Sequence, residues 1–153
     1  MALVAWYRLD GNALDSSGHG RHGTPGANVQ WVNGKISQCG EFTGASSQTI
    51  NIGVGSDWFP LPIFSVAFWI KSPGLAEGMG QNGILSLTYT LTFALNSDGS
   101  LQFRGGGNHS VPTGLHDDQW HHIVCTYDGV RKQVYKDGDL LWSTASDWSG
   151  NTT

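Results

Sequence analysis

The stretch Trp120-His121-His122-Ile123-Val124-Cys125-Thr126-Tyr127-Asp128-Gly129 decides the fold class of this chain. A run rich in β-branched and aromatic residues leads into an Asp-Gly pair, which tolerates the positive φ angles of a tight hairpin. Neighbouring side chains in a strand point to opposite faces, so the run divides into two sets. These sets are Ile123, Cys125 and Tyr127 on one face and His122, Val124 and Thr126 on the other. We expect the first set to be buried and the second to be partly exposed.

Similar short runs recur along the chain, with turn residues between them. They cover residues 3–9, 48–52, 64–70, 84–89, 91–95, 101–103, 120–127, 133–136 and 140–142. Asp98-Gly99 and Asp137-Gly138 repeat the hairpin chemistry of Asp128-Gly129. This spacing predicts an all-β protein, a two-layer antiparallel β-sandwich that forms one domain over residues 1–153.

The run at residues 64–70 has two apolar faces. Val66, Phe68 and Ile70 share one face, and Ala67 and Trp69 share the other. Because a strand with one wet face alternates apolar and polar residues, we expect this strand to be central and covered on both sides.

The charge and hydropathy of the chain argue against two classes of partner. The formal net charge is −4, and the basic residues are scattered except at 131, 132 and 136, so no basic stripe marks a nucleic-acid site. The longest apolar run, residues 63–70, is far shorter than the roughly 20 residues of a membrane-spanning helix. Met1 leads directly into an apolar run without a basic region or a cleavage site, so we expect no signal peptide in this chain.

Several motifs, in order along the chain, resemble the laminin G-like jelly roll of the concanavalin A-like lectins and glucanases. They are Asp15-Ser16-Ser17-Gly18 behind the first run, Glu41-Phe42-Thr43-Gly44, Phe64-Ser65-Val66-Ala67-Phe68-Trp69, the Trp120-His121-His122 strand and the Asp137-Gly138 hairpin. The resemblance implies the jelly-roll fold. It implies no single function, because this fold hosts lectins, adhesion modules, enzymes and virion parts.

The resemblance also implies an unusual end to the chain. Members of the family usually continue past the last Asp-Gly hairpin into one or two more strands, one of which pairs beside the first strand. This sequence stops at Thr153, so we expect a jelly roll that lacks its final strand. Leu3, Val4 and Trp6 would then form an exposed strand edge that another copy or another protein covers. We therefore expect a homo-oligomer or a complex with a protein partner.

The acidic residues do not support catalysis. The related glucanases use two acidic residues close together on one strand. Glu41 and Glu77 are the only glutamates, and the aspartates mostly sit beside glycines in turns. We expect no enzyme activity.

A metal site is the main alternative to plain turn chemistry in the first loop. Asp10, Asn12 and Asp15 supply hard oxygen ligands at short spacing, which suits Ca²⁺, the one cofactor we consider. The same side chains could instead fix the turn through Asx hydrogen bonds. His121 and His122 are adjacent and face opposite ways in a strand, so we expect a hydrogen-bonded structural role there.

Exposed aromatic rings and loop amides are the candidate ligand contacts. Four tryptophans fall in or near loops or late runs and could offer flat platforms to sugar rings: Trp31, Trp58, Trp142 and Trp148. Asn108 follows a glycine-rich stretch that we expect to be a loop. Cys39 and Cys125 are too few for a disulfide framework, and we favour two buried thiols over one disulfide.

Two functions remain from the sequence. The first is a non-catalytic assembly module on the surface of a multimeric particle, such as a virion decoration or fibre protein. The second is a calcium-assisted carbohydrate-binding or adhesion domain. The first places the protein on a virion surface and the second outside the cell.

Overall fold

A computed structural model of the chain describes residues 3–44, 48–53, 63–74, 81–87, 91–105 and 107–145. The chain forms two compact units, residues 1–53 and 54–153. The described ranges hold antiparallel strands and turns and no helix, which confirms the all-β class. No described segment is a helix that could cross a membrane. The single domain over residues 1–153 stays a prediction.

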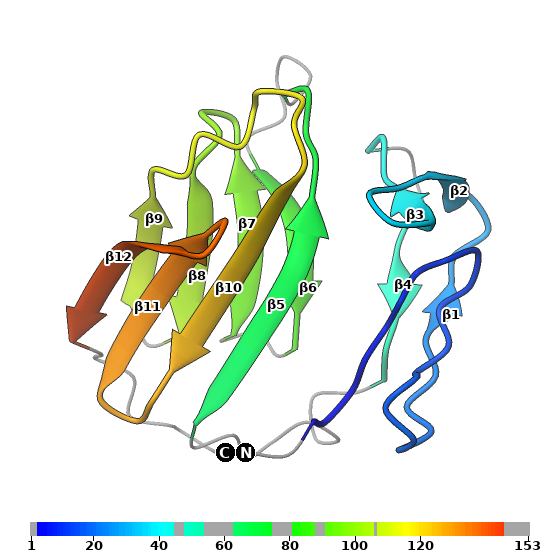
Figure 1. Ribbon diagram of the computed structural model, residues 1–153, viewed down its shortest axis with the longest axis horizontal. Helices are drawn as coiled ribbons and strands as arrows, with labels where there is room; N and C mark the ends of the chain where they lie inside the picture. The colour runs from blue at the N-terminus through cyan, green and yellow to red at the C-terminus, as the bar shows by residue number, and fades with distance from the viewer. Residues whose placement is uncertain are drawn as a thin grey trace. The chain divides into compact units, whose positions relative to one another are not determined.

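The second unit is a sandwich of two four-stranded sheets, which Figure 1 shows one in front of the other. The front sheet has the order β12 (Asp139–Ala145), β11 (Arg131–Lys136), β10 (His121–Tyr127), β5 (Phe64–Ile70). The back sheet has the order β6 (Gln81–Ser86), β7 (Thr92–Asn96), β8 (Leu101–Gly105), β9 (Gly107–Val111). This arrangement is the predicted two-layer architecture.

Phe103 on β8 lies at the centre of the core between the sheets. Its ring centroid is 4.8 Å from that of Phe93 on the same sheet and 6.3 Å from that of Phe64 on the front sheet. Ile123, Cys125 and Tyr127 are buried, whereas His122, Val124 and Thr126 are half-buried. The division of this strand into a buried and a wetter face is therefore confirmed. Lys132 is fully buried, with its Nζ 5.6 Å from the Phe103 ring centroid.

The predicted Asp-Gly turns connect the strands as expected. Asp137 and Gly138 have φ angles of 54° and 99° and join β11 to β12 as a two-residue hairpin loop. Positive φ at both central positions is the requirement of a type I′ turn, which matches the twist of the flanking strands. Gly99 and Gly129, after Asp98 and Asp128, also have positive φ.

Two predictions about the strands of this unit are wrong. The strand at residues 64–70 was expected to be central, but β5 ends the described front sheet, and Trp69 on its outer side is 44% exposed. The glycine-rich stretch before Asn108 was expected to be a loop, but β8 runs to Gly105 and β9 begins at Gly107. Glycines lack a side chain to mark a strand face, so the pattern hid this hairpin.

The first unit contains two short ladders. β1 (Thr24–Pro25) pairs with β4 (Ile50–Asn51), and β2 (Gln30–Asn33) pairs with β3 (Gln38–Glu41). The strand expected at residues 3–9 is absent, and only Tyr7 makes a bridge, to Asp15. The physical reason is local. The Asp15 side chain accepts a hydrogen bond from the Trp6 N–H, and the backbone of Leu9 is not extended, with a φ angle of 56°.

Both cysteines are free thiols. Cys125 is fully buried, and burial raises its pKa to about 12. Cys39 is half-buried, and burial together with the charge of Glu41 raises its pKa as well.

Candidate functional site

The outer face of the front sheet carries three rows of side chains that cross the strands. Residues paired across antiparallel strands point to the same face, so the register defines each row. The aromatic row is Trp69 and His122; the apolar row is Ala67, Val124, Tyr135 and Leu140; the polar row is Ser65, Thr126, Gln133 and Ser143. We call these rows together the outer face.

The aromatic row places a large ring where solvent can reach it. Trp69 on β5 lies directly opposite His122 on β10, with ring centroids 5.1 Å apart at an interplanar angle of 41°. Such tilted pairs hold both rings in place and contribute about 0.5–1.5 kcal/mol beyond the area they bury. Trp69 stays 44% exposed, so part of its ring reaches solvent while His122 packs against it.

The apolar row continues across all four strands next to Trp69. Leu140 is 54% exposed, and Tyr135 and Val124 are half-buried. A β-bulge between Val134 and Tyr135 shifts the register so that Leu140 pairs with Tyr135. The bulge therefore sets Leu140, instead of Leu141, opposite Tyr135 on this row, since such a shift changes which side chains face outward.

The polar row offers uncharged donors and acceptors. Ser65 and Ser143 are exposed at its two ends, and Thr126 and Gln133 are half-buried between them. Three hydroxyls and one amide can each donate and accept hydrogen bonds. None of the twelve acidic residues of the chain lies in any of the three rows.

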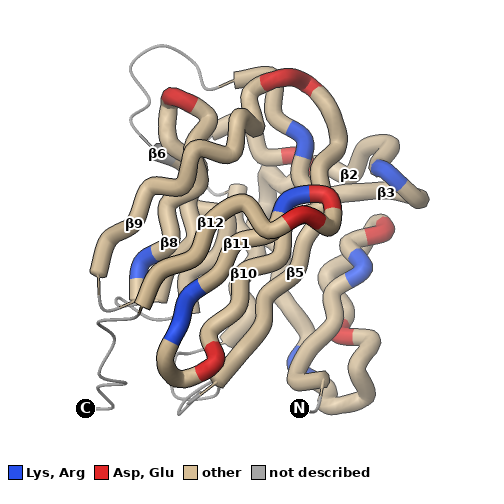
Figure 2. Tube along the Cα trace, turned by 60° about the vertical axis from the view of Figure 1, so that its left-hand side comes forward, with Lys and Arg blue, Asp and Glu red and all other residues tan. Residues whose placement is uncertain are grey.

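Charged side chains gather at the ends of the strands. Figure 2 shows the middle stretches of β5, β10, β11 and β12 without charge colours and the acidic residues in the turns. Four carboxylates border the end that carries Trp69: Asp117, Asp118, Asp137 and Asp139. Beyond the polar row, at the other end, Arg131 stands next to Asp128.

His121 ties the acidic end together. Its Nδ1 lies 2.6 Å from Oδ2 of Asp137, and its Nε2 lies 2.9 Å from Oδ2 of Asp117. The hydrogen bond to Asp137 raises the pKa of His121, against the effect of burial, and the bond to Asp117 adds to the rise. Oδ1 of Asp137 also accepts the N–H of His122, which fixes the start of β10 against the hairpin. The structural role expected for this histidine is confirmed.

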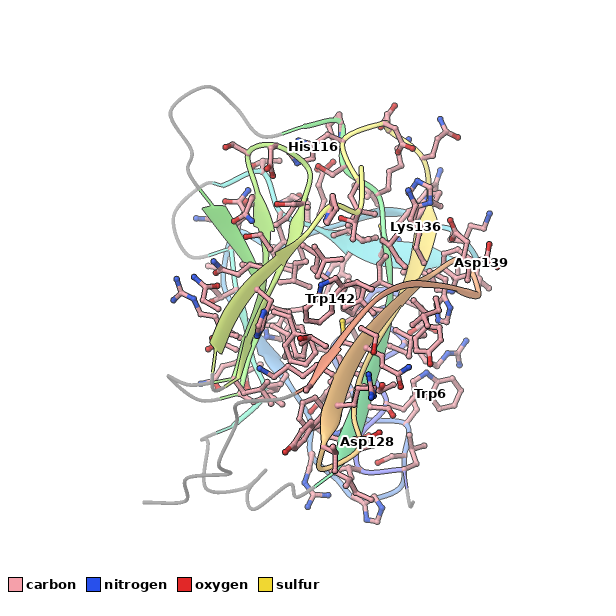
Figure 3. The ribbon with its side chains drawn as sticks, turned by 90° about the vertical axis from the view of Figure 1, so that its left-hand side faces the viewer. Trp6, His116, Asp128, Lys136, Asp139 and Trp142 are labelled. Atoms are coloured by element: carbon pink, nitrogen blue, oxygen red, sulfur yellow. The ribbon has the colours of Figure 1, made fainter. Side chains whose placement is uncertain are left out.

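The ligand contacts expected from the sequence do not meet at one place. Trp31 is half-buried on β2 in the first unit, and Asn108 is exposed on β9, opposite Arg104. Trp58 and Trp148 lie outside the described residues. Figure 3 shows Trp142 pointing from β12 into the space between the sheets, where its ring centroid is 5.1 Å from that of His109. As ligand contacts, the following therefore remain predictions: Trp31, Trp58, Asn108 and Trp148.

In the candidate calcium loop, protein groups occupy the oxygens of Asp15. Oδ1 accepts the N–H groups of Trp6 and Ser17, and Oδ2 accepts the Ser17 hydroxyl and the Arg21 N–H. Burial alone would raise the pKa of this carboxyl, but the four hydrogen bonds hold it well below the usual range.

The other two candidate calcium ligands of that loop also have protein partners. Asn12 accepts the N–H of Leu14 through Oδ1, and Asp10 pairs with Arg8 at 2.9 Å. Among the described residues, no group of three or more His, Cys, Asp or Glu side chains is arranged to hold a metal ion. The Asx-turn interpretation accounts for the bonds from the Leu14 N–H to Asn12 and from the Ser17 N–H to Asp15. The calcium site stays a prediction.

Leu3, Val4 and Trp6 are exposed but form no strand, so the expected strand edge is not present and their role in assembly stays a prediction. Their exposed fractions are 58%, 37% and 53%. The Arg21 guanidinium and the His19 ring contact the carbonyls of Val4 and Leu3 at 3.2 and 3.0 Å.

Sequence reasoning missed the outer face. Alternation already places Trp69 opposite the core set of β5 and His122 opposite the core set of β10. The pairing of these two strands, which are far apart along the chain, is a property of the fold and has no local signal in either strand.

Comparison with known proteins agrees with the two-layer fold. The model of the concanavalin A-like lectin/glucanases superfamily matches residues 43–152. The chain belongs to this superfamily. No curated protein sequence matches the chain.

Two solved structures share the fold. Domain 4 of AbnA, a GH43 extracellular arabinanase from Geobacillus stearothermophilus solved in complex with arabinotriose, is 21% identical with a TM-score of 0.70, over 94% of this chain and 75% of that one. The binding domain of Paraclostridial Mosquitocidal Protein 1 is 18% identical with a TM-score of 0.63. The match covers 86% of the present chain and 37% of the mosquitocidal chain. The protein therefore spans little more than a third of the mosquitocidal chain.

Proposed function

We propose that this protein is a non-catalytic carbohydrate-binding module that holds a glycan on its outer face. The observation that carries the proposal is the fixed, half-exposed ring of Trp69 on a face where an apolar row separates it from a row of uncharged hydroxyl and amide groups. Sugar rings have apolar faces and hydroxylated edges, so a face that combines an aromatic ring, apolar side chains and neutral hydrogen-bonding groups is complementary to them. The arabinotriose bound by the arabinanase domain of the same fold supports this ligand class.

The chemistry of the outer face supports binding without hydrolysis. Cleavage of a glycosidic bond needs an acid and a second carboxylate flanking the bond. The ten residues of the three rows include no carboxylate. Glu41 lies on β3 in the first unit, and Glu77 lies outside the described residues. The proposed location is outside the cell, where such glycans occur.

The test is calorimetric titration with a panel of oligosaccharides, using Trp69→Ala and, as matched control, Trp6→Ala. Both tryptophans are about half exposed, but only Trp69 lies on the outer face. We expect Trp69→Ala to weaken binding about tenfold or more, as truncation of an aromatic anchor does, and Trp6→Ala to leave it unchanged. Absence of glycan binding, or equal affinity of wild type and Trp69→Ala with circular dichroism unchanged, overturns the proposal.

The second candidate is an assembly module, such as a decoration or fibre component on a virion surface. Its supporting observation is the exposed apolar group of Leu3, Val4 and Trp6. An exposed apolar patch is typical of a protein contact. Sedimentation velocity distinguishes the candidates, because assembly predicts an oligomer that Trp6→Ser dissociates, whereas the glycan-binding module sediments equally with either residue at position 6.

A further inference from the structure

The three rows of the outer face differ in chemistry from one row to the next, while each row keeps one chemistry along its length. The apolar row and the polar row each span four strands, which is about 14 Å between the first and last strand at about 4.8 Å per strand. Successive rows lie two residues apart along a strand, or roughly 7 Å. The surface is therefore a set of stripes that run across the strands.

A ligand with one apolar side and one polar edge fits such stripes in only one direction. A sugar chain laid along the apolar row rests its ring faces on Val124, Tyr135 and Leu140 and turns its hydroxyl edge toward Thr126 and Gln133. A chain laid along a strand would cross from Trp69 over Ala67 to Ser65 and would place one ring face on hydroxyl groups. In that direction only Trp69 and Ala67 offer apolar contact, and the sugar ring over Ser65 has no apolar side chain to stack on.

The border of the outer face is acidic at one end. Four carboxylates, Asp117, Asp118, Asp137 and Asp139, stand at the end next to Trp69. The basic groups at that end are Lys71, which pairs with Asp118 at 3.2 Å, Lys136, and His121, which lies between Asp117 and Asp137. The chain as a whole carries a formal charge of −4. An anionic glycan would meet repulsion within about one Debye length of these carboxylates.

We propose that the outer face takes an uncharged glycan chain that lies across β5, β10, β11 and β12, and that it excludes acidic glycans. This inference rests on the proposed function and adds the ligand's charge and direction. One end of the glycan lies beside Trp69 and Ser65, and its other end lies beside Leu140 and Ser143.

The charge is tested with a panel that contains neutral arabinan, xylan, galactan and glucan oligosaccharides together with oligogalacturonates and their carboxyl-reduced forms. We expect every oligosaccharide that binds to be neutral and its affinity to change less than twofold between about 50 and 500 mM salt. In Asp118→Asn/Asp139→Asn, the neutral affinity should stay within twofold. A preferred acidic ligand overturns the inference but leaves the binding function standing, provided that Trp69→Ala abolishes its binding.

The direction is tested with a length series of the best neutral ligand against Ser65→Ala and Ser143→Ala, which remove one hydroxyl at each end of the polar row. If the chain crosses the strands, each variant weakens binding of a long oligosaccharide roughly two- to tenfold, the size of one hydrogen bond. The corresponding disaccharide responds to one variant at most. A long oligosaccharide that responds to Ser65→Ala and not to Ser143→Ala overturns the crossing direction. Failure of the whole panel to bind overturns the proposed function itself.

Discussion

Trp69 and His122 face each other across the β5–β10 pair with their ring centroids 5.1 Å apart. The imidazole limits the rotation of the indole, because it fills the space into which the larger ring would turn. A platform that is already ordered loses less conformational entropy when a ligand binds. The position of His122 should therefore matter for affinity even where His122 itself contacts no ligand.

We predict that His122→Ala weakens glycan binding roughly two- to tenfold, less than Trp69→Ala does. The expected size follows from the roughly 0.5–1.5 kcal/mol of an aromatic pair beyond its burial. Calorimetry measures the affinity, and His122→Phe is the control that should restore most of it by keeping a ring opposite Trp69. A loss in His122→Ala that His122→Phe does not restore indicates a direct hydrogen bond from the imidazole instead.

The cluster of Asp117, His121 and Asp137 predicts how stability depends on pH. The pKa of His121 is raised, so its contribution is complete below its unfolded value of about 6.5 and is lost as the pH rises through the folded value. The pKa values of Asp117 and Asp137 are lowered, mainly by their hydrogen bonds to His121, so their contribution is lost as the pH falls below about 4.

The melting temperature should therefore be highest between about pH 4 and 6.5 and should fall on either side. His121→Gln should flatten the fall on the alkaline side, whereas His19→Gln, which changes an exposed histidine of the first unit, should keep it. Thermal unfolding followed by circular dichroism across this range provides the measurement. An unchanged alkaline limb in His121→Gln would mean that another group governs stability there.

Phe103 predicts the stability of the sandwich. It is fully buried and contacts rings from both sheets, Phe64 and Phe93, so truncation leaves a cavity that neither sheet alone can close. We expect Phe103→Ala to lower the free energy of unfolding by about 3–5 kcal/mol. Val130→Ala, at a position 70% exposed in the β10–β11 turn, should change it by no more than about 0.5 kcal/mol. Urea denaturation measures both, and a similar cost for the two variants contradicts the assignment of the core.

Local patterns predicted the strands and turns of the second unit well, because alternation and Asp-Gly pairs are local signals. At Lys132, alternation and residue type give opposite predictions. Alternation puts Lys132 on the same side as the buried Val134, whereas lysine is almost never fully buried. The structure follows alternation, and the Nζ of Lys132 lies over the Phe103 ring.

The candidate site was less accessible to prediction, because it is made by register. Ser65, Thr126, Gln133 and Ser143 come from four strands and form a row only once three pairings are known. The first run of the sequence failed for another reason. Residues 3–9 have a strand-like composition, but the carboxylate of Asp15 offers the Trp6 N–H a partner that needs no neighbouring strand.

The same carboxylate leads to a prediction about metal dependence. Both oxygens of Asp15 already accept two hydrogen bonds each, from Trp6, Ser17 and Arg21. Calcium would have to displace these donors, each of which is then left without its partner in a partly buried site. We therefore expect EDTA to leave the melting temperature unchanged and Asp15→Asn to lower it, since an amide oxygen replaces only one of the two acceptors.

Asp10→Asn is the matched control, because Asp10 is also a candidate ligand but makes an ion pair with Arg8 that is more exposed. It should leave the melting temperature close to that of the wild type, as loss of a surface ion pair usually does. A rise of the melting temperature on addition of Ca²⁺ that both Asp15→Asn and Asp10→Asn abolish would instead establish the loop as a calcium site, with the hydrogen bonds of Asp15 as its metal-free arrangement.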